Sequence, residues 1–467
     1  MPVRLRKNIL VAALMSVSVL ASPLGAGAES LTEAMASSYG GNPTLRAERA
    51  RQRSTDELVP QAMAGWKPTI TASAEVAYRI DDNDNAPGSF LNSTPNRPRE
   101  SIPLGLQIQL VQPLFRGFKT TEGTAQAEAT VKAGRENLLV VEQQILFQTA
   151  QAYMNVVRDR QIVDLRKQNV QVLRTQLTGA RERFAVGEVT KTDVEQSRAR
   201  LSAAEALLST SKATLANSVA NYQRVVGHAP GTLRFPKMVR MPRSLDEALT
   251  IAGRTNPNVL SAAYVEEASR HNIEVVRGDL LPEVVLNASA TERITDLGEN
   301  PGQEVQDLRV GGQVNLPLYD GGRTYSAVRQ AKHISSQRRL QVLETGRAVS
   351  EAVAQSWSAL EASRQTIAAA RAQVEAATLA VEGVRQEFLV GSRTTLDVLN
   401  AEAELVNARI QLVTAQRDQI IASYQLLGAV GNLNARYLSL PVGRYDPAPN
   451  YVAARKKWID TTADTIQ

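Results

Sequence analysis

Residues 183–201 read RFAVGEVTKTDVEQSRARL, and residues 387–405 read EFLVGSRTTLDVLNAEAEL, so one glycine-broken pattern occurs twice, 204 positions apart. Glycine readily adopts the left-handed conformation that ends a helix, and Thr followed three residues later by Asp forms a capping box for the next helix. Each stretch therefore predicts a tight turn between two helices. The residues that predict these turns are Val186, Gly187, Thr190 and Asp193 in the first copy, and Val390, Gly391, Thr394 and Asp397 in the second.

The duplication extends well beyond these turns. Residues 30–34, SLTEA, match residues 244–248, SLDEA, at an offset of 214, whereas the offset from Pro113 onward is 204. The ten extra residues of the first copy fall in the polar stretch 81–100, DDNDNAPGSFLNSTPNRPRE, which predicts an exposed loop. The chain therefore divides into a first repeat at 29–235, a second repeat at 244–431 and a C-terminal tail at 432–467.

The first 28 residues have the features of a secretory signal peptide. Three basic residues precede an apolar run at 9–20, and small residues at 26–28 suit a signal peptidase. Removal of residues 1–28 takes away three positive charges and no acids, which lowers the formal net charge from +6 to about +3. So small a surplus predicts no nucleic-acid partner. The absence of cysteine excludes a disulfide framework and a lipid-modified cysteine.

Four segments alternate between apolar and polar residues with the two-residue period of a β-strand. In the first segment, Ile70, Ala72 and Ala74 face one way, and Thr71 and Ser73 face the other. The four segments lie at about 68–80, 102–114, 282–294 and 306–318. Their length and their single apolar face favour membrane strands, with hairpins on a soluble antiparallel sheet as the alternative. Because membrane barrels begin at about eight strands, membrane strands would require several copies of the chain.

Helical sequence runs for about 65 residues after each strand pair. Apolar residues stand seven apart along it, at Val156, Val163, Val170, Leu177 and Phe184, and again at Leu360, Ile367, Val374, Val381 and Phe388. This spacing is typical of coiled coils, and such a helix would reach roughly 100 Å. A basic column runs beside it, at Arg160, Lys167, Arg174, Arg181, Arg364, Arg371 and Arg385. The column is either a solvated flank that covers the seam or the lining of a conduit.

The tandem duplication, the paired strands, the long heptad helices and the VGxxT turns together resemble the TolC family of outer-membrane efflux and secretion channels. The resemblance implies a homotrimer with a mainly helical fold and membrane β-strands. Three protomers with four strands each would form a 12-stranded β-barrel in outer-membrane lipid, continued by a 12-helix α-barrel through the periplasm. It also implies a periplasmic adaptor (membrane fusion) protein and an inner-membrane pump, of the RND or ABC type, that open this exit duct for small molecules or proteins.

The resemblance assigns roles to the residues of the turns. Those expected to contact the adaptor at the periplasmic tips are Val186, Gly187, Thr190, Val390, Gly391 and Thr394. Those expected to form the periplasmic gate are Thr192, Asp193, Phe388, Arg393, Asp397 and Asn400. Phe388 lacks the hydroxyl found in the best-known member, and Asn400 replaces one of its two acidic rings. We therefore expect a less cation-selective entrance. For the two aspartates, helix capping alone is the alternative to gating.

Other classes of protein find less support in the sequence. The three histidines, at 228, 271 and 333, have no metal-ligand spacing, and no motif for nucleophilic catalysis or phosphate binding is present, so neither an enzyme nor a cofactor is predicted. The acidic run at 81–84 lacks the spaced ligands of a calcium loop. The alternative to a channel is a periplasmic adaptor or coiled-coil binding protein without a pore. Such adaptors normally carry one helical hairpin, whereas this chain predicts two.

Overall fold

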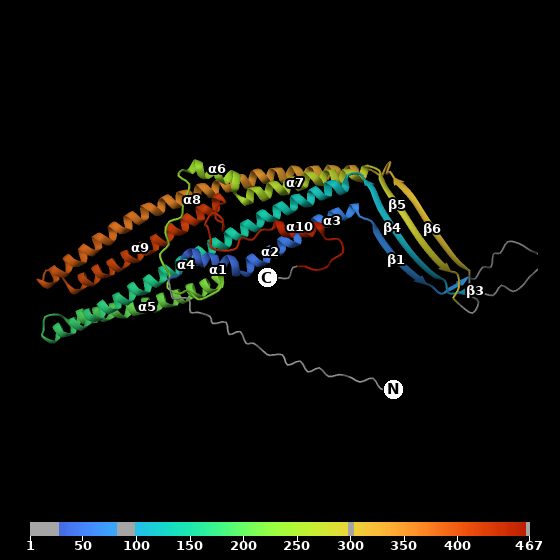
Figure 1. The fold of residues 1–467 in the computed structure, drawn as a ribbon. Helices are drawn as coiled ribbons and strands as arrows, with labels where there is room; N and C mark the ends of the chain where they lie inside the picture. The colour runs from blue at the N-terminus through green and yellow to red at the C-terminus, as the bar shows by residue number, and fades with distance from the viewer. Residues whose placement is uncertain (1–27, 82–98, 298–302, 464–467) are drawn as a thin grey trace, which may run out of the picture.

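The computed structural model describes residues 28–81, 99–297 and 303–463. The predicted signal peptide at 1–28, apart from Ala28, lies outside the described residues, as does most of the predicted loop at 81–100. The described chain is elongated, with a β-sheet at one end and the tips of two helical hairpins at the other (Figure 1). Within this part of the chain, no helix is both long enough and apolar enough to cross a membrane.

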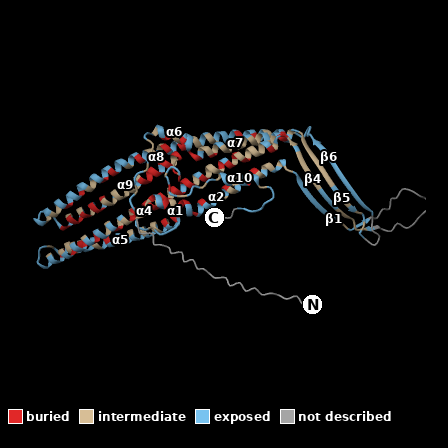
Figure 2. Cartoon of the chain, viewed as in Figure 1, coloured by how far each residue is buried: buried red, intermediate tan, exposed pale blue. Residues whose placement is uncertain are grey.

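One antiparallel sheet contains strands from both repeats. Its strands, in the order β1-β4-β5-β6, are β1 (Thr69–Val76), β4 (Leu104–Arg116), β5 (Glu283–Ile294) and β6 (Glu304–Asn315). Two short strands, β2 (Arg79–Asp81) and β3 (Arg99–Ser101), form a separate pair beyond β1 and β4. Every residue of β1 and β6 is exposed, because these strands form the two edges of the four-stranded sheet (Figure 2).

The register of the sheet separates apolar from polar side chains. Ile108 of β4 lies opposite Ala72 and Ala290, and Ala290 in turn lies opposite Leu308. The neighbouring row pairs Gln107 with Ser73 and with Thr291 on the other face. Since successive residues of a strand point to opposite faces, the sheet has one mainly apolar and one mainly polar face.

Two of the strand segments differ in extent from the alternating patterns in the sequence. The segment at 68–80 is interrupted after Val76, and its continuation pairs with β3 rather than β4. The segment at 306–318 is regular only as far as Asn315, and it begins earlier, at Glu304. Apolar alternation continues through Leu316 and Leu318, but beyond Asn315 no partner residue on β5 remains, since β5 begins at Glu283.

The two long hairpins have identical dimensions. Helices α4 (Lys119–Ala185) and α8 (Arg323–Leu389) each have 67 residues, and the returning helices α5 (Lys191–Val226) and α9 (Thr395–Val430) each have 36. The predicted heptad seam is buried along most of its length. Val156 and Val163 are 0% and 4% exposed, whereas Phe184, at the tip, is 46% exposed. Packing of the seam therefore loosens toward the turns.

The remaining helices pack along the sides of the hairpins. They are α1 (Leu31–Gly41), α2 (Pro43–Asp56), α3 (Leu58–Met63), α6 (Leu245–Thr255), α7 (Pro257–Arg277) and α10 (Ala448–Lys456), with one-turn helices η1 (Ala64–Trp66) and η2 (Gly278–Leu280). The sequence at 44–65 reads as one helix, but the structure breaks it between α2 and α3. Pro60 has no N–H to donate to the carbonyl of Asp56, so the helix is interrupted there.

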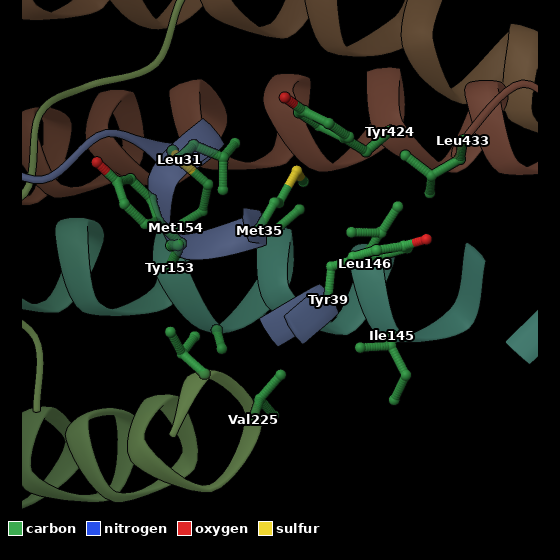
Figure 3. Close-up of a cluster of buried hydrophobic side chains, with 14 of the residues drawn as sticks. Leu31, Met35, Tyr39, Ile145, Leu146, Tyr153, Met154, Val225, Tyr424 and Leu433 are labelled. Atoms are coloured by element: carbon green, nitrogen blue, oxygen red, sulfur yellow. The ribbon is translucent and has the colours of Figure 1, made fainter. Parts of the chain in front are cut away.

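The largest hydrophobic core lies where the N-terminal helix, both returning helices and the C-terminal tail meet α4. Figure 3 shows Met35 and Tyr39 of α1 beside Leu146 of α4, with Tyr424 of α9 and Leu433 of the tail above them in this view. Leu433 is fully buried, so the first residues of the tail belong to the core rather than to a free extension. Both repeats are therefore held together near the middle of the molecule.

Candidate functional site: the two helical tips

The two tips share one backbone conformation. Gly187 has φ 82° and Gly391 has φ 81°, so each adopts the left-handed conformation that only glycine tolerates well. No atom lies within 4 Å of a side-chain carbon added at either position, so backbone conformation rather than space requires the glycine. The adjoining valines project outward, with Val186 72% and Val390 80% exposed. Each tip therefore presents an apolar side chain beside a fixed turn.

Both returning helices begin with the predicted capping box. In the first copy, the amide N–H of Asp193 donates to Thr190 Oγ1 at 3.3 Å, and the amide of Thr190 donates to Asp193 Oδ2 at 2.9 Å. In the second copy, the corresponding distances between Asp397 and Thr394 are 3.3 and 3.0 Å. These hydrogen bonds from Thr394 hold the pKa of Asp397 below its usual value. Capping is thus a structural duty of both aspartates.

Arg393, one of the residues predicted to form the gate, has an acidic partner within its own tip. Its Nε lies 2.7 Å from Glu387 Oε2, and this ion pair raises the pKa of the guanidinium. The pair joins the last turn of α8 to the segment that leads into α9. Glu387 is absent from the predicted gate, in which the resemblance associates Arg393 with Thr192 and Asp193. Thr192 itself is exposed at the start of α5.

Phe388, also predicted to belong to the gate, lies beneath a cation from the other hairpin. The guanidinium carbon of Arg183, near the end of α4, is 4.6 Å from the centre of the Phe388 ring. Within this distance the positive charge is attracted to the face of the ring. Phe388 lacks a hydroxyl, but its ring still has a charged partner in Arg183.

Asn400 also contacts the first hairpin. Its Oδ1 accepts a hydrogen bond from Arg200 Nη2 at 2.9 Å, which links α9 to α5. Both residues are exposed. Among the residues that the structure describes, Arg200 forms no ion pair with a carboxylate. The sequence predicted only the loss of an acidic group at position 400. The structure places the neutral amide of Asn400 beside the additional positive charge of Arg200.

Three residues to which the sequence assigned no role make contacts at or near the tips: Arg183, Arg200 and Glu387. Arg183 and Arg200 join the two hairpins, whereas Glu387 pairs within the second tip. One signal in the sequence could have found all three: opposite charges at equivalent positions of the duplication. Arg183 and Glu387 occupy equivalent positions of the duplication, 204 residues apart, and carry opposite charges. A reversal of charge at equivalent positions shows that the two copies have different partners there. Arg200 gives the same signal, because Glu404 stands at its equivalent position, but the reversal does not identify the partner of Arg200, which depends on how α5 and α9 lie together.

The basic column beside the heptad seam makes contacts within the protomer. Arg160 donates to the carbonyl oxygens of Pro230 and Gly231 at 3.0 and 2.6 Å. Arg174 lies 3.1 Å from Glu205 on the returning helix, and Arg385 pairs with Glu402 on α9. These contacts agree with a flank that covers the seam.

Two of the three histidines, His228 and His271, lie beside glutamates. His271 Nδ1 lies 2.7 Å from Glu122 Oε2, and His228 Nε2 lies 3.4 Å from Glu29 Oε1. No group of three or more potential metal ligands occurs within the described part of the chain.

A four-stranded sheet with one apolar face, joined end to end with two long helical hairpins that share one tip geometry, defines the protomer of an outer-membrane channel. The model of the outer membrane efflux protein family matches residues 37–228 and 249–432 of this chain. The chain belongs to that family, which consists of channel proteins. It is an outer-membrane exit duct, with its helical part extending into the periplasm.

Individual relatives agree with this assignment. The chain is 38% identical over 453 residues to the outer membrane efflux protein BepC of Brucella suis, covering 97% of this chain and 96% of the relative. It is 26% identical over 432 residues to the outer membrane protein TolC of Escherichia coli, with coverage of 88% and 84%. The solved structure of the CmeC outer membrane channel of Campylobacter jejuni has the same fold, with a TM-score of 0.76 at 15% identity, covering 91% of this chain and 89% of that one.

Proposed function

We propose that the chain works as a homotrimer, in which three protomers form one continuous duct from the periplasm through the outer membrane. The observation that supports this proposal is the open sheet. Its edge strands, β1 and β6, leave backbone N–H and C=O groups unpaired within the described protomer. A sheet with open edges is not tolerated in lipid, whereas three such sheets joined edge to edge close a barrel of 12 strands, four from each protomer.

The helical part offers a matching surface for assembly. Leu340, Leu343 and Leu379 of α8 are 66%, 58% and 75% exposed in the protomer. Scattered apolar residues are normal on a protein surface, but these three lie on a helix that continues from edge strand β6. We infer that α8 packs against a neighbouring protomer, so that 12 long helices, four per protomer, surround the periplasmic part of the duct.

The tips are the proposed docking surface for a periplasmic adaptor protein, which connects the channel to an inner-membrane pump of the RND or ABC type. Exposed Val186 and Val390 provide apolar contacts, while Gly187 and Gly391 fix the shape of each turn. Six such turns would surround the mouth of a trimer. The pump, rather than the duct, would select the cargo, either small molecules or proteins.

The gate is proposed at the same end. In the closed state, Arg393 and Phe388 would contact Thr192 and Asp193 on the neighbouring returning helix, and Arg393 would exchange Glu387 for these partners. We expect Arg393→Ser to raise the leak current of the closed channel. Val189→Ser, at the equivalent position of the first copy, serves as the matched control. An equal leak current in the Arg393→Ser and Val189→Ser variants would show that Arg393 is not part of the gate.

The proposed assembly is tested by extracting the protein from outer membranes in detergent, measuring its native mass and recording single-channel conductance in planar bilayers. A trimeric mass together with discrete conductance steps is expected. A water-soluble, monomeric and non-conducting product would instead indicate a coiled-coil binding protein without a pore.

The charge at the entrance provides a test of the gate positions. If Asn400 lines the constriction, Asn400→Asp should shift the reversal potential in a salt gradient toward cation selectivity. The nearby Arg200 should reduce that shift, so adding Arg200→Gln should enlarge it. Unchanged selectivity in both variants would place Asn400 away from the constriction.

We also propose that residues 1–28 are removed on export, which leaves Glu29 as the first residue. Glu29 is held firmly: its backbone N donates to the carbonyl of Thr232 at 2.7 Å, and Tyr222 OH donates to Glu29 Oε1 at 2.8 Å. The mass of the N-terminal peptide of the purified protein tests this assignment. A mature chain that begins elsewhere would contradict it.

A further inference from the structure

Large apolar side chains gather at the end of the sheet nearest the helices. Trp66 lies three residues before β1 begins, and Phe118 lies two residues after β4 ends; they are 47% and 59% exposed. Trp and other aromatic residues are enriched where a membrane protein passes through the lipid headgroups. These positions therefore mark the level at which the sheet leaves the membrane on the periplasmic side.

The C-terminal tail reaches the same level. Helix α10 packs on α2 and α3, where Asn450 Nδ2 donates to the fully buried Asp56 at 2.7 Å. Arg455 lies 3.4 Å from Glu128 of α4, which fixes the end of α10. The segment after α10 then turns close to the beginning of β1 (Figure 1).

This segment forms a short closed loop. Lys457 Nζ donates to the carbonyl of Thr462 at 2.7 Å, and Asp460 Oδ1 accepts the amide N–H of Thr462 at 2.8 Å. Between these closing contacts the loop exposes two apolar side chains, Trp458 at 68% and Ile459 at 94%. The loop therefore displays its most apolar residues outward instead of folding them onto the protein.

The loop is connected to the base of the sheet. Lys67 Nζ lies 5.4 Å from the centre of the Trp458 ring, and Lys67 stands two residues before β1. Lys67 and the exposed Lys456 add positive charge beside the two apolar side chains. An apolar tip flanked by lysines matches a bilayer surface, where rings enter the headgroup layer and lysines meet anionic phosphates.

We propose that the loop at 457–462 is a membrane anchor, in which Trp458 and Ile459 insert into the periplasm-facing phospholipid layer of the outer membrane. The anchor would clamp the tail between the helical wall, through Asn450 and Arg455, and the lipid at the base of β1. Continuity with the membrane-spanning sheet and the adjacent positive charge favour phospholipid over a protein partner as the occupant.

The chain's three tryptophans, Trp66, Trp357 and Trp458, allow a direct test. Trp66→Phe with Trp357→Phe leaves Trp458 as the single fluorophore. Trp66→Phe with Trp458→Phe leaves Trp357, which packs against the helical core around Val353 and Leu426 and serves as the control. Both variants are placed as full-length channels in nanodiscs that contain anionic phospholipid and a lipid spin-labelled either at the headgroup or at the middle of the acyl chain.

We expect the emission of Trp458 to be quenched, most strongly by the headgroup label, while the emission of Trp357 stays unchanged. Two outcomes would overturn the proposal. Quenching by aqueous acrylamide without lipid quenching would place Trp458 in water. Protection from both quenchers would place it against a neighbouring protomer. Single-channel conductance of both variants should equal that of the wild type, so failure of the anchor is distinguishable from failure of the channel.

Discussion

The two tips of the protomer share a backbone but differ in their side chains. Gly187 and Gly391 have nearly the same φ, and both returning helices start with a Thr–Asp capping box. The side chains before and within the turns diverge. Arg183 of the first copy corresponds to Glu387 of the second, and Val189 corresponds to Arg393.

The duplicated sequence thus preserves what the turn needs, while the side-chain contacts at the tips depend on residues that the copies do not share. Arg183 of the first tip lies over Phe388 of the second, and Glu387 pairs with Arg393 inside the second tip. Neither contact has an equivalent in the other copy. The symmetry between the tips therefore covers the backbone and the caps, and it ends at these side chains.

Replacing either turn glycine should have the largest effect, and the effect should be equal in the two tips. Gly187→Ala and Gly391→Ala each force a side chain into the left-handed conformation, which costs about 1–2 kcal/mol. Native-state hydrogen exchange at the start of α5 and α9 measures the free energy of local opening. A much larger loss at one glycine than at the other would show that the two turns are not equivalent.

Removing a capping hydroxyl should have a smaller effect that is again equal in the tips. Thr190→Ala and Thr394→Ala each leave an amide at the helix start without its side-chain acceptor, which costs about 1 kcal/mol. The same exchange measurement applies, and Thr→Ser at each position should retain most of the protection. Unchanged exchange in the alanine variants would contradict the capping role.

The contact between the tips should be asymmetric. Phe388→Leu removes the ring beneath Arg183 and should loosen the two hairpins by about 0.5–1 kcal/mol. Phe184→Leu, the equivalent change in the first copy, removes no such contact and is the control. Distances between spin labels on the two tips, measured by electron paramagnetic resonance, should broaden only in the Phe388 variant. Equal broadening in the Phe184 and Phe388 variants would show that the loosening comes from the heptad seam, to which both residues belong, and not from the contact with Arg183.

The ion pair inside the second tip should have a still smaller effect on stability. Both Arg393 and Glu387 are about half exposed, so solvent screening keeps the contribution of their pairing to stability small. Glu387→Gln should therefore leave thermal unfolding nearly unchanged while it frees Arg393 for other partners. A large fall in unfolding temperature would show that Glu387 has a structural duty beyond this pair.

Acidification should weaken the second cap. Because the folded-state pKa of Asp397 is lowered by its hydrogen bonds with Thr394, its contribution to stability is present above the ordinary aspartate pKa of about 4 and is lost as the pH falls through the folded value. The difference in thermal stability between the wild type and Asp397→Asn should therefore narrow on acidification below that point. If the difference in thermal stability between the two proteins does not change with pH, the cap does not depend on the ionised carboxylate of Asp397.

Local chemistry allowed much of this architecture to be predicted. Glycine turns, capping boxes and heptad spacing depend on residues close in sequence, so Gly187, Thr190 and their counterparts indicated the hairpins correctly. Contacts between distant segments left no such pattern. The pairing of Arg200 with Asn400 joins helices 200 residues apart, and it depends on how the two hairpins lie together. The roles of the tips in docking and gating stay predictions.

The strands show the same limit. Alternation indicated the two faces of the sheet, but it did not show where pairing stops. The pattern continues through Leu318, although regular pairing of β6 ends at Asn315. A strand ends where its partner ends, and the partner's position is a property of the whole sheet.

The open edges of the sheet also have a genetic consequence. If a barrel needs β1 of one copy and β6 of the next, a single defective copy interrupts the ring for its two neighbours. In a cell that makes normal and edge-defective chains in equal amounts, random mixing would leave about one trimer in eight wholly normal. Mutations on β1 or β6 that prevent edge pairing should therefore act dominantly.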